Sequence, residues 1–155
     1  MTPRHSVRLA TRADAAVIGH HRAAMFRDMG LVGDADVPAL AAASCAAIAP
    51  LLGTPDYLGW LVEADGRVAA GGALVVRRLL PRPEALEGGE EAYLLNLYTE
   101  PTYRRRGLAR ALVETMLAWC VAHGIRRVSL HASAEGRPLY ESFGFAATNE
   151  MRLDL

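Results

Sequence analysis

A long amphipathic helix between two strands is the feature that most limits how this chain can fold. Apolar side chains recur at three- and four-residue intervals from Leu108 to Cys120, which predicts a helix that ends near His123 and Gly124. Strand-like segments at 93–99 and 125–132 flank it. Because strands alternate with helices in this half of the chain, the sequence predicts a layered α/β fold.

The first half of the chain adds a hairpin, which makes the predicted sheet mixed. Apolar runs at 57–64 and 68–76 meet at Asp65-Gly66, a pair that suits a tight turn because both central residues need positive φ. We expect one domain over residues 1–155, with a central, twisted, mixed β-sheet flanked by about four helices. The other predicted elements are a strand at 6–10, helices at 15–29, 39–49 and 137–143, a loop at 78–89, and a final strand or pair of strands at 145–155.

Composition argues against several classes of function. The 17 basic and 17 acidic side chains cancel, whereas a general nucleic-acid binder carries a basic excess. No apolar run reaches the ~18 residues that a membrane helix needs. Cys45 and Cys120 are far apart and lack the spacing of a metal site or a disulfide scaffold. We therefore expect a cytoplasmic protein with no metal, and no nucleic acid or membrane as partner.

A basic turn at the start of the long helix indicates an anion site. The first N–H groups of a helix lack internal partners, and the helix dipole adds partial positive charge there. The small residues Gly107 and Ala109 allow close approach to this backbone, and a pyrophosphate is the natural ligand. Flanking arginines supply further positive charge, namely Arg104, Arg105, Arg106 and Arg110.

Two short motifs in the second half of the chain point to the same family. The first is Arg104-x-x-Gly107-x-Ala109, which lies between a predicted strand and a predicted helix. The second is Leu139-Tyr140-Glu141-x-x-Gly144-Phe145. Together they resemble the Arg/Gln-x-x-Gly-x-Gly/Ala pyrophosphate loop and the second acyl-CoA motif of the GNAT superfamily of N-acetyltransferases. The order of predicted elements agrees with that family over 6–155.

The resemblance implies transfer of an acetyl group from acetyl-CoA to an amine, by direct attack within a ternary complex. The strand before the basic turn would separate from its neighbour near 97–99 and pair with the pantetheine arm. Ser133 stands where many members place an asparagine that contacts the cofactor. The implied cofactor-binding residues are Leu97, Tyr98, Thr99, Arg104, Arg105, Arg106, Gly107, Leu108, Ala109, Arg110, Ser133 and Tyr140.

Two residues receive catalytic roles on this basis. We expect the backbone N–H of Leu97 to polarise the acetyl carbonyl. Tyr140 matches the tyrosine that the family often places near the thioester sulfur. Because an ordinary thiol pKa of about 8.5 lies below an ordinary tyrosine pKa of about 10, Tyr140 is expected mainly to donate a hydrogen bond to the departing thiolate.

The sequence leaves the general base undecided. Some family members carry a glutamate on the strand before the phosphate loop, but the corresponding residues here are Leu95 and Asn96. Glu100 is the nearest acid, while His20 and His21 lie in the region that lines the acceptor cleft of the family. A water chain on backbone carbonyls is an equal alternative.

The sequence also leaves the acceptor unidentified, as a primary amine of a small molecule or a peptide. The residues expected at this substrate are His21, Met25 and Phe26 on the first predicted helix, together with Asn96. Acidic side chains near the 78–89 loop either attract a cationic amine or are simply solvated; they are Glu84, Glu87, Glu90 and Glu91.

Two other readings compete with catalysis. One is a non-catalytic, acyl-CoA-binding or regulatory domain of the same fold, which the missing strand glutamate favours. The other is an interaction module that uses the phosphate loop for a different ligand. The chain contains neither the Gly-Lys-Ser/Thr of a P-loop nor the Gly-x-Gly-x-x-Gly of a dinucleotide fold. The resemblance also allows a homodimer paired through sheet edges.

Overall fold

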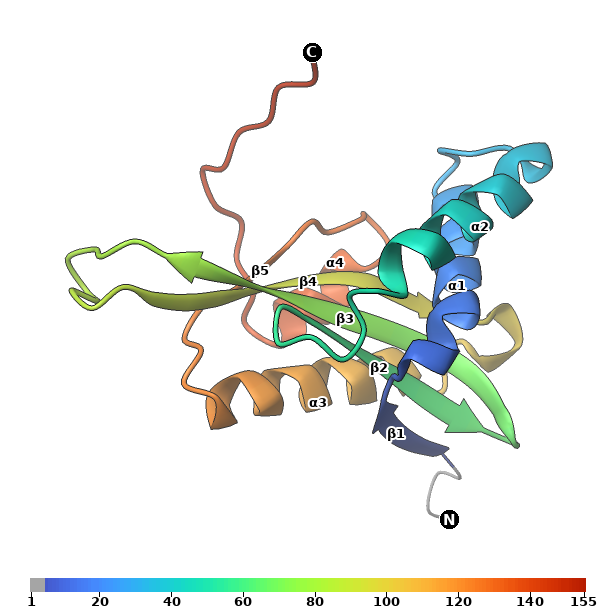
Figure 1. Ribbon diagram of the computed structural model, residues 1–155, viewed down its shortest axis with the longest axis horizontal. Helices are drawn as coiled ribbons and strands as arrows, with labels where there is room; N and C mark the ends of the chain where they lie inside the picture. The colour runs from blue at the N-terminus through green and yellow to red at the C-terminus, as the bar shows by residue number, and fades with distance from the viewer. Residues whose placement is uncertain (1–4) are drawn as a thin grey trace.

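The fold is built on a mixed β-sheet, which the computed structural model describes within residues 5–155 (Figure 1). Within that range, five strands follow one another across the sheet in chain order. The first four pair antiparallel, and the last is parallel to its neighbour, so the predicted mixed sheet is confirmed. The strands are β1 (His5–Leu9), β2 (Tyr57–Ala64), β3 (Arg67–Leu79), β4 (Gly89–Thr99) and β5 (Val128–Leu130).

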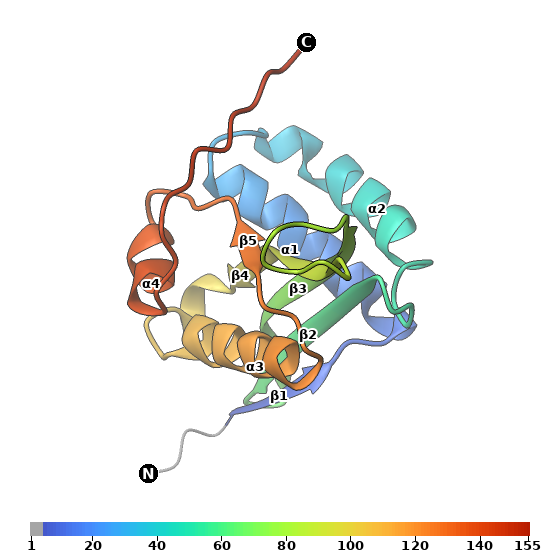
Figure 2. The same cartoon turned by 90° about the vertical axis from the view of Figure 1, so that its left-hand side faces the viewer.

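Helices cover both faces of this sheet (Figures 1 and 2). One face carries α1 (Ala15–Asp28) with α2 (Val37–Ile48) against it, and the other carries α3 (Leu108–Ala122). The short α4 (Arg137–Ser142) follows β5. Single 3-10 turns precede the three longer helices, at η1 (Arg12–Asp14), η2 (Asp34–Asp36) and η3 (Pro101–Tyr103).

The predicted core face of the long helix is confirmed. Leu112, Val113 and Met116 of α3 are completely buried, and Cys120 is buried one turn further on. They pack on the sheet in one hydrophobic cluster, while a second cluster lies between the sheet and α1. The sheet is therefore a fixed platform with a separate apolar layer on each face.

A glycine sets how closely α1 and α2 approach each other. A Cβ atom at Gly19 would lie 2.6 Å from the carbonyl oxygen of Ala41 and 2.9 Å from the amide nitrogen of Cys45. Any side chain at this position would push the two helices apart. This close packing against α2 fixes the position of α1, including His20 and His21, which follow Gly19.

The hairpin of β2 and β3 forms as predicted, and the hairpin of β3 and β4 is longer than predicted. Asp65 and Gly66 adopt φ angles of 52° and 74°, which confirms the tight turn. The predicted loop at 78–89 was too long, because β3 and β4 pair out to Leu79 opposite Gly89. Turn residues in this loop marked its centre correctly but gave no information on how far the ladder extends.

The prediction of a final strand at 145–155 was wrong. Residues 146–155 form neither helix nor strand and run away from the body of the molecule (Figures 1 and 2). The predicted strand at 125–132 is also reduced to the three residues of β5. A strand exists only where its backbone groups find a partner edge, and the tail meets no such edge within the described part of this chain.

Candidate active site

The sheet opens between β4 and β5. Their parallel ladder joins only residues 92–94 to residues 128–130. Beyond Leu94, the edge of β4 that faces β5 has no strand partner within residues 5–155. On this edge, the backbone groups of 95–99 that do not bond to β3 are therefore free for a ligand, and the segment includes Leu97, Tyr98 and Thr99. The Thr99 carbonyl is an exception, because it accepts a hydrogen bond from Arg104.

A bulge in β4 lies at the start of this opening. Leu95 pairs with Ala73 and Tyr98 pairs with Gly71, so two residues of β4 face one residue of β3. Asn96 has a φ angle of 57° in this bulge and is buried. Its side-chain NH₂ donates to the Tyr57 hydroxyl at 3.2 Å, and its carbonyl oxygen accepts from Arg22 at 2.5 Å. The bulge thus turns Asn96 toward α1.

The basic turn places an open helix N-terminus directly after β4. Arg105 and Gly107 both adopt positive φ, at 62° and 81°, and Gly107 caps α3. A Cβ atom at Gly107 would meet nothing within 4 Å. The first N–H groups of α3, from Leu108, Ala109 and Arg110, therefore start a helix whose end is accessible to an anion.

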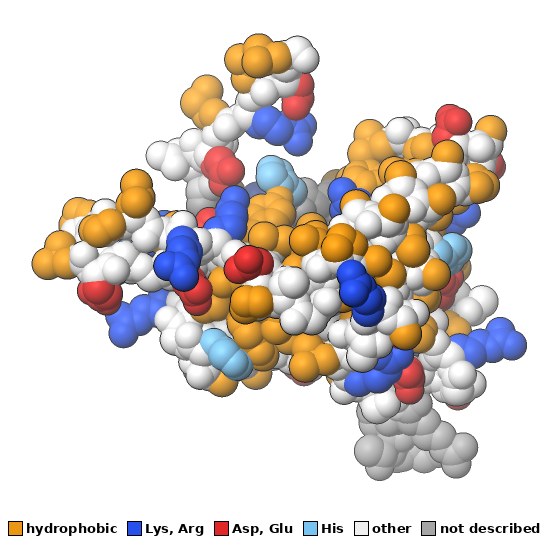
Figure 3. All heavy atoms as spheres, in the orientation of Figure 1, with side chains coloured by type: hydrophobic (Ala, Val, Ile, Leu, Met, Phe, Trp, Pro, Cys, Tyr) orange, Lys and Arg blue, Asp and Glu red, His pale blue; other side chains and the backbone are white. Residues whose placement is uncertain are grey.

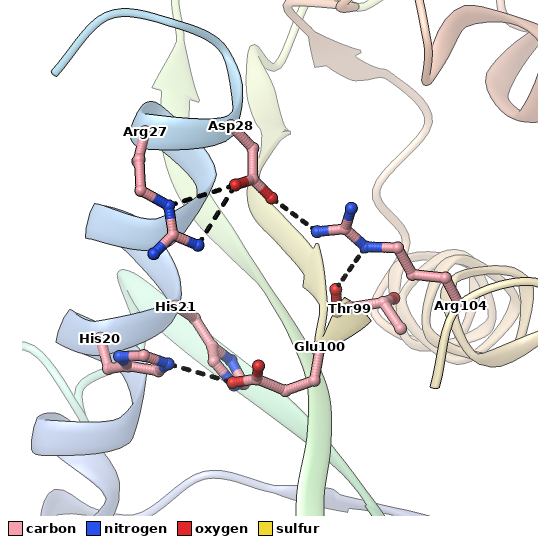
Figure 4. A network of polar contacts seen from close by, with 7 residues as sticks. All are labelled: His20, His21, Arg27, Asp28, Thr99, Glu100 and Arg104. Carbon is pink, nitrogen blue, oxygen red and sulfur yellow. Dashed lines mark hydrogen bonds and ion pairs between the residues drawn. The ribbon is translucent and has the colours of Figure 1, made fainter. Parts of the chain in front are cut away.

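The arginines of this turn do not behave alike. Arg104 donates to the Asp28 carboxylate at 2.6 Å and to the Thr99 carbonyl at 3.0 Å (Figure 4). Arg106 lies over the Tyr103 ring, and Arg110 donates to the Ser142 hydroxyl at 2.9 Å. Arg105 makes no ion pair within the described range and is exposed. Arg104 therefore fastens the turn to the end of α1, and Arg105 is the side chain best placed to meet an external anion.

Tyr140 lies within α4, and Ser133 lies in the turn that leads into this helix, with Gly136 close to both side chains. The Tyr140 ring is 8% exposed and packs edge-on against Phe145 at 5.8 Å between centroids. Burial raises the pKa of the Tyr140 phenol, so the group stays protonated and can donate. Ser133 accepts a hydrogen bond from the Gly136 N–H at 3.1 Å, so its hydroxyl stabilises the turn into α4.

Glu100, which directly follows β4, places its carboxylate between two histidines of α1. One Glu100 oxygen lies 3.1 Å from Nε2 of His20 and 3.4 Å from Nε2 of His21 (Figure 4). His20 is exposed, whereas His21 is 2% exposed and packs in a tilted arrangement against Tyr98, at 5.2 Å between ring centroids. Burial lowers the pKa of His21 to about 4, and the neighbouring Glu100 only partly offsets this effect. His21 is therefore neutral at neutral pH.

A small cavity beneath α1 connects this cluster to the bulge. Its polar lining comes from His21, Tyr57 and Asn96. Nε2 of His21 lies 3.4 Å from Glu100 without a well-aligned hydrogen bond, and Nδ1 has no polar partner within residues 5–155. The remaining lining is apolar or glycine: Ile18, Gly59, Trp60, Leu61, Gly71, Gly72 and Ala73. Buried polar atoms normally have partners, so the His21 nitrogens mark this cavity as a place for a further polar group.

The residues predicted at the substrate fall into two groups. His21 and Asn96 line the same cavity. Met25 and Phe26 are half-buried further along α1, where the Arg22 guanidinium lies 4.8 Å from the centre of the Phe26 ring. Sequence reasoning assigned no role to Arg22. It missed Tyr57, whose position at the start of a strand carried no functional signal.

The acidic loop contributes little to this site. Glu84 contacts Arg82 at 3.0 Å and Arg127 at 3.4 Å, and Glu91 contacts Arg77 at 2.5 Å. The tip of the β3–β4 hairpin also projects from one end of the sheet, whereas α1 lies toward the other end (Figure 1). These carboxylates are largely neutralised by their partners and are distant from α1.

Comparison with known proteins identifies the family. A sequence profile of the acetyltransferase (GNAT) family matches residues 28–145, which include the basic turn and the whole of both motifs. The chain therefore belongs to the GNAT family, and the resemblance found in the sequence is confirmed. A similar protein is the glucosamine 6-phosphate N-acetyltransferase of Trypanosoma brucei brucei, 30% identical over 95 residues. That match covers 60% of this chain and 61% of the trypanosomal protein.

Two solved structures are similar over almost the whole chain. A GCN5-related N-acetyltransferase from Ralstonia eutropha JMP134 is 32% identical, with a TM-score of 0.86 over 97% of this chain and 98% of that one. A predicted acetyltransferase from Clostridium acetobutylicum, solved with acetyl-CoA, is 25% identical, with a TM-score of 0.83 over 97% and 95% of the two chains. The fold class predicted from the sequence is therefore confirmed.

Residues 5–155 show neither a membrane-spanning helix nor a cluster of metal ligands. No helix in this range combines the length and the apolar character needed to cross a membrane. No group of three or more histidine, cysteine or acidic side chains in the same range is arranged to hold a metal ion.

Burial of His21 predicts a specific loss of stability in mild acid. In the unfolded chain the imidazole binds a proton near pH 6.5, whereas the folded side chain stays neutral down to about 4. The free energy of unfolding therefore falls as the pH drops from about 6.5 to about 4, by at most about 3 kcal/mol from this group. Urea denaturation at a series of pH values measures this slope.

The matched variant is His21→Phe, which keeps a ring against Tyr98 but cannot titrate. We expect this variant to lose that part of the pH dependence. His20→Phe, at an exposed position, should keep it. An unchanged slope in His21→Phe would contradict the assignment of a neutral, buried imidazole.

Proposed function

We propose that this chain is an N-acetyltransferase that moves an acetyl group from acetyl-CoA to a primary amine. The observation that carries the proposal is the open edge of β4 at 95–99, which leads through the basic turn to the accessible N-terminus of α3. A strand edge can bond the amides of a pantetheine arm, and a helix N-terminus can bind a diphosphate. Family membership and the acetyl-CoA in the Clostridium structure support this cofactor.

The proposed reaction is a direct aminolysis in a ternary complex. The amine nitrogen attacks the acetyl carbonyl carbon, a C–N bond forms, the C–S bond breaks, and coenzyme A leaves as a thiolate. One proton must leave the amine nitrogen, and one must reach the sulfur. Much of the acceleration comes from holding both substrates in line, because a positioned pair reacts far faster than two free molecules.

Negative charge develops in this reaction on the carbonyl oxygen and on the leaving sulfur. We assign Leu97 to the first and Tyr140 to the second. The N–H of Leu97 belongs to the unpaired part of β4 and is assigned to the carbonyl oxygen of the tetrahedral intermediate. The Tyr140 phenol is assigned to the leaving sulfur. Its raised pKa suits hydrogen-bond donation to the thiolate better than complete proton transfer.

We assign removal of the amine proton to Glu100, with His20 beside it. Asn96 cannot take a proton, and its amide is already bonded to Arg22 and Tyr57. Glu100 is partly exposed and ends the open segment of β4, and the exposed His20 contacts the same carboxylate oxygen. Glu100 would accept the proton from the amine, and His20 would exchange it with solvent.

A non-catalytic acyl-CoA sensor is the alternative function. The observation that favours it is the absence of a titratable side chain at the β4 bulge, where Asn96 is committed to two hydrogen bonds. Release of free thiol from acetyl-CoA in the presence of amines separates the two functions. A sensor would bind the coenzyme and release no thiol.

The C-terminal tail supports a homodimer. Met151, Leu153 and Leu155 are exposed and alternate with polar residues along the tail, and hydrophobic side chains occupy its free end (Figure 3). β5 is the last strand of the sheet described here, and all of its residues are only half-buried. The tail of one copy would add a strand to β5 of a second copy, which satisfies both backbones and covers the alternate apolar side chains.

Substitution at Gly107 tests the cofactor site. Gly107→Glu places a carboxylate at the helix N-terminus, so we expect acetyl-CoA affinity to fall by about 100-fold or more through blocking and like-charge repulsion. Gly124→Glu is the matched control, because Gly124 follows the other end of α3, also has positive φ, and also has open space around it. Calorimetry should show that only Gly107→Glu loses binding, and equal affinity in both variants would overturn the cofactor site.

The Tyr140→Phe variant tests the role of the phenol. The ring is buried, so phenylalanine preserves the packing against Phe145 and removes only the hydroxyl. We expect kcat to fall roughly 10- to 100-fold while the KM for acetyl-CoA stays within about twofold. Steady-state assay of thiol release measures both constants. An unchanged kcat would remove Tyr140 from the mechanism.

Deletion of residues 149–155 tests the homodimer. Sedimentation velocity should find a dimer for the full chain and a monomer for the shortened one, because the added strand supplies the contact. Circular dichroism controls for intact folding of the shortened chain. A full chain that sediments as a monomer at all accessible concentrations would refute the pairing.

A further inference from the structure

Arg22 is a partly buried cation whose charge is not neutralised within the protein. Three other arginines in the described range are also partly buried, and each of them contacts a carboxylate: Arg8, Arg27 and Arg82. Arg22 has no carboxylate within ion-pair distance in the same range. Its partners are the Asn96 amide oxygen at 2.5 Å and the face of the Phe26 ring. A charge that is partly withdrawn from water is stabilised by a counter-ion, so this arrangement can accept an anion from outside.

The surroundings hold Arg22 ready for such an anion. Asn96 is fixed by its second hydrogen bond, to the Tyr57 hydroxyl, so its carbonyl oxygen keeps facing Arg22. This contact occupies one N–H of the guanidinium, which has five. The free N–H groups form the planar fork that binds a carboxylate or a phosphate through two parallel hydrogen bonds.

The position of Arg22 links this charge to the proposed reaction. Its partner Asn96 immediately precedes Leu97, whose N–H we assign to the acetyl carbonyl. An anion on Arg22 therefore lies close to the point at which the amine attacks. A second ammonium group at the same point would be repelled by Arg22. Of the four acidic side chains near the β3–β4 hairpin tip, Glu84 and Glu91 are paired with arginines there, at the end of the sheet away from α1.

We propose that Arg22 binds an anionic group of the acceptor, so that the acceptor carries a primary amine together with a carboxylate or a phosphate. This inference rests on the proposed transfer to an amine and narrows its substrate class. It differs from the cationic amine that the acidic side chains near the 78–89 loop left open as one alternative. Arg22 acts in binding and orientation, and it forms and breaks no covalent bond.

A panel of short amines tests the substrate class. The acceptors are n-propylamine, 3-aminopropanoate, 2-aminoethyl phosphate and 1,3-diaminopropane, and thiol release from acetyl-CoA gives kcat/KM for each. We expect at least one of the two anionic amines to exceed propylamine by about 10- to 100-fold, which is the usual value of a charge-assisted hydrogen bond. The two anionic arms distinguish carboxylate from phosphate recognition. The diamine should be the poorest acceptor.

Variants of Arg22 assign the preference to this residue. Arg22→Met removes the charge and should equalise the anionic and neutral amines, while Arg22→Lys should retain part of the preference as a point charge. Arg12→Met, at an exposed arginine just before α1, is the control and should behave like the unaltered chain. Acetyl-CoA affinity measured by calorimetry should be the same in all four proteins, which shows that the coenzyme site is intact.

Direct binding separates a failure of this inference from a failure of the proposed function. Calorimetric titration of the same two anionic amines into the CoA-loaded protein reports binding without turnover. If they bind through Arg22 but no amine releases thiol, acetyl transfer is overturned and the anion site stands. If thiol is released equally well with propylamine, or if Arg22→Met keeps the anionic preference, the anionic acceptor class is overturned and acetyl transfer stands.

Discussion

Backbone N–H and C=O groups along β4 need partners on both sides, and the sheet supplies them unevenly. On one side β3 pairs with β4 almost from end to end, which makes the strand rigid. On the other side β5 pairs with residues 92–94 alone, so the backbone at 95–99 is left for a ligand. The strand that is held most firmly by the sheet is therefore also the one that is open to a cofactor, and α3 begins directly after it with an accessible N-terminus.

Charge around this opening is distributed in two distinct ways. Arg104 is neutralised by Asp28 and fastens the basic turn to the end of α1, which fixes the angle between the open strand and the helix carrying the acceptor side chains. Arg22 and His21, from neighbouring positions on α1, are not neutralised in this way. Burial keeps His21 uncharged, and Arg22 keeps a charge with neutral partners only. The ion pair of Arg104 with Asp28 holds the site together, while Arg22 is left without a carboxylate partner within residues 5–155.

Local sequence patterns predicted the parts of this structure that short-range forces control. The apolar period of α3, the Asp65-Gly66 turn and the helix-opening Gly107 all depend on residues within a few positions of one another. The prediction failed at 145–155, because a strand needs a partner edge and the tail pairs with none within residues 5–155. It also treated the arginines of the basic turn as one group, although Asp28 captures Arg104 from the far side of the opening.

The sequence by itself determined the family, the order of the elements and the position of the anion-binding turn. Each of these depends on residues that lie close together in the chain at a fixed spacing. Only the tertiary structure decided which side chains meet at the bulge. Asn96, Tyr57 and Arg22 come from three different elements and are joined by contacts across 39 and 74 positions of the chain. No periodicity or motif encodes such contacts, since they arise when packing of α1 on the sheet brings distant segments together.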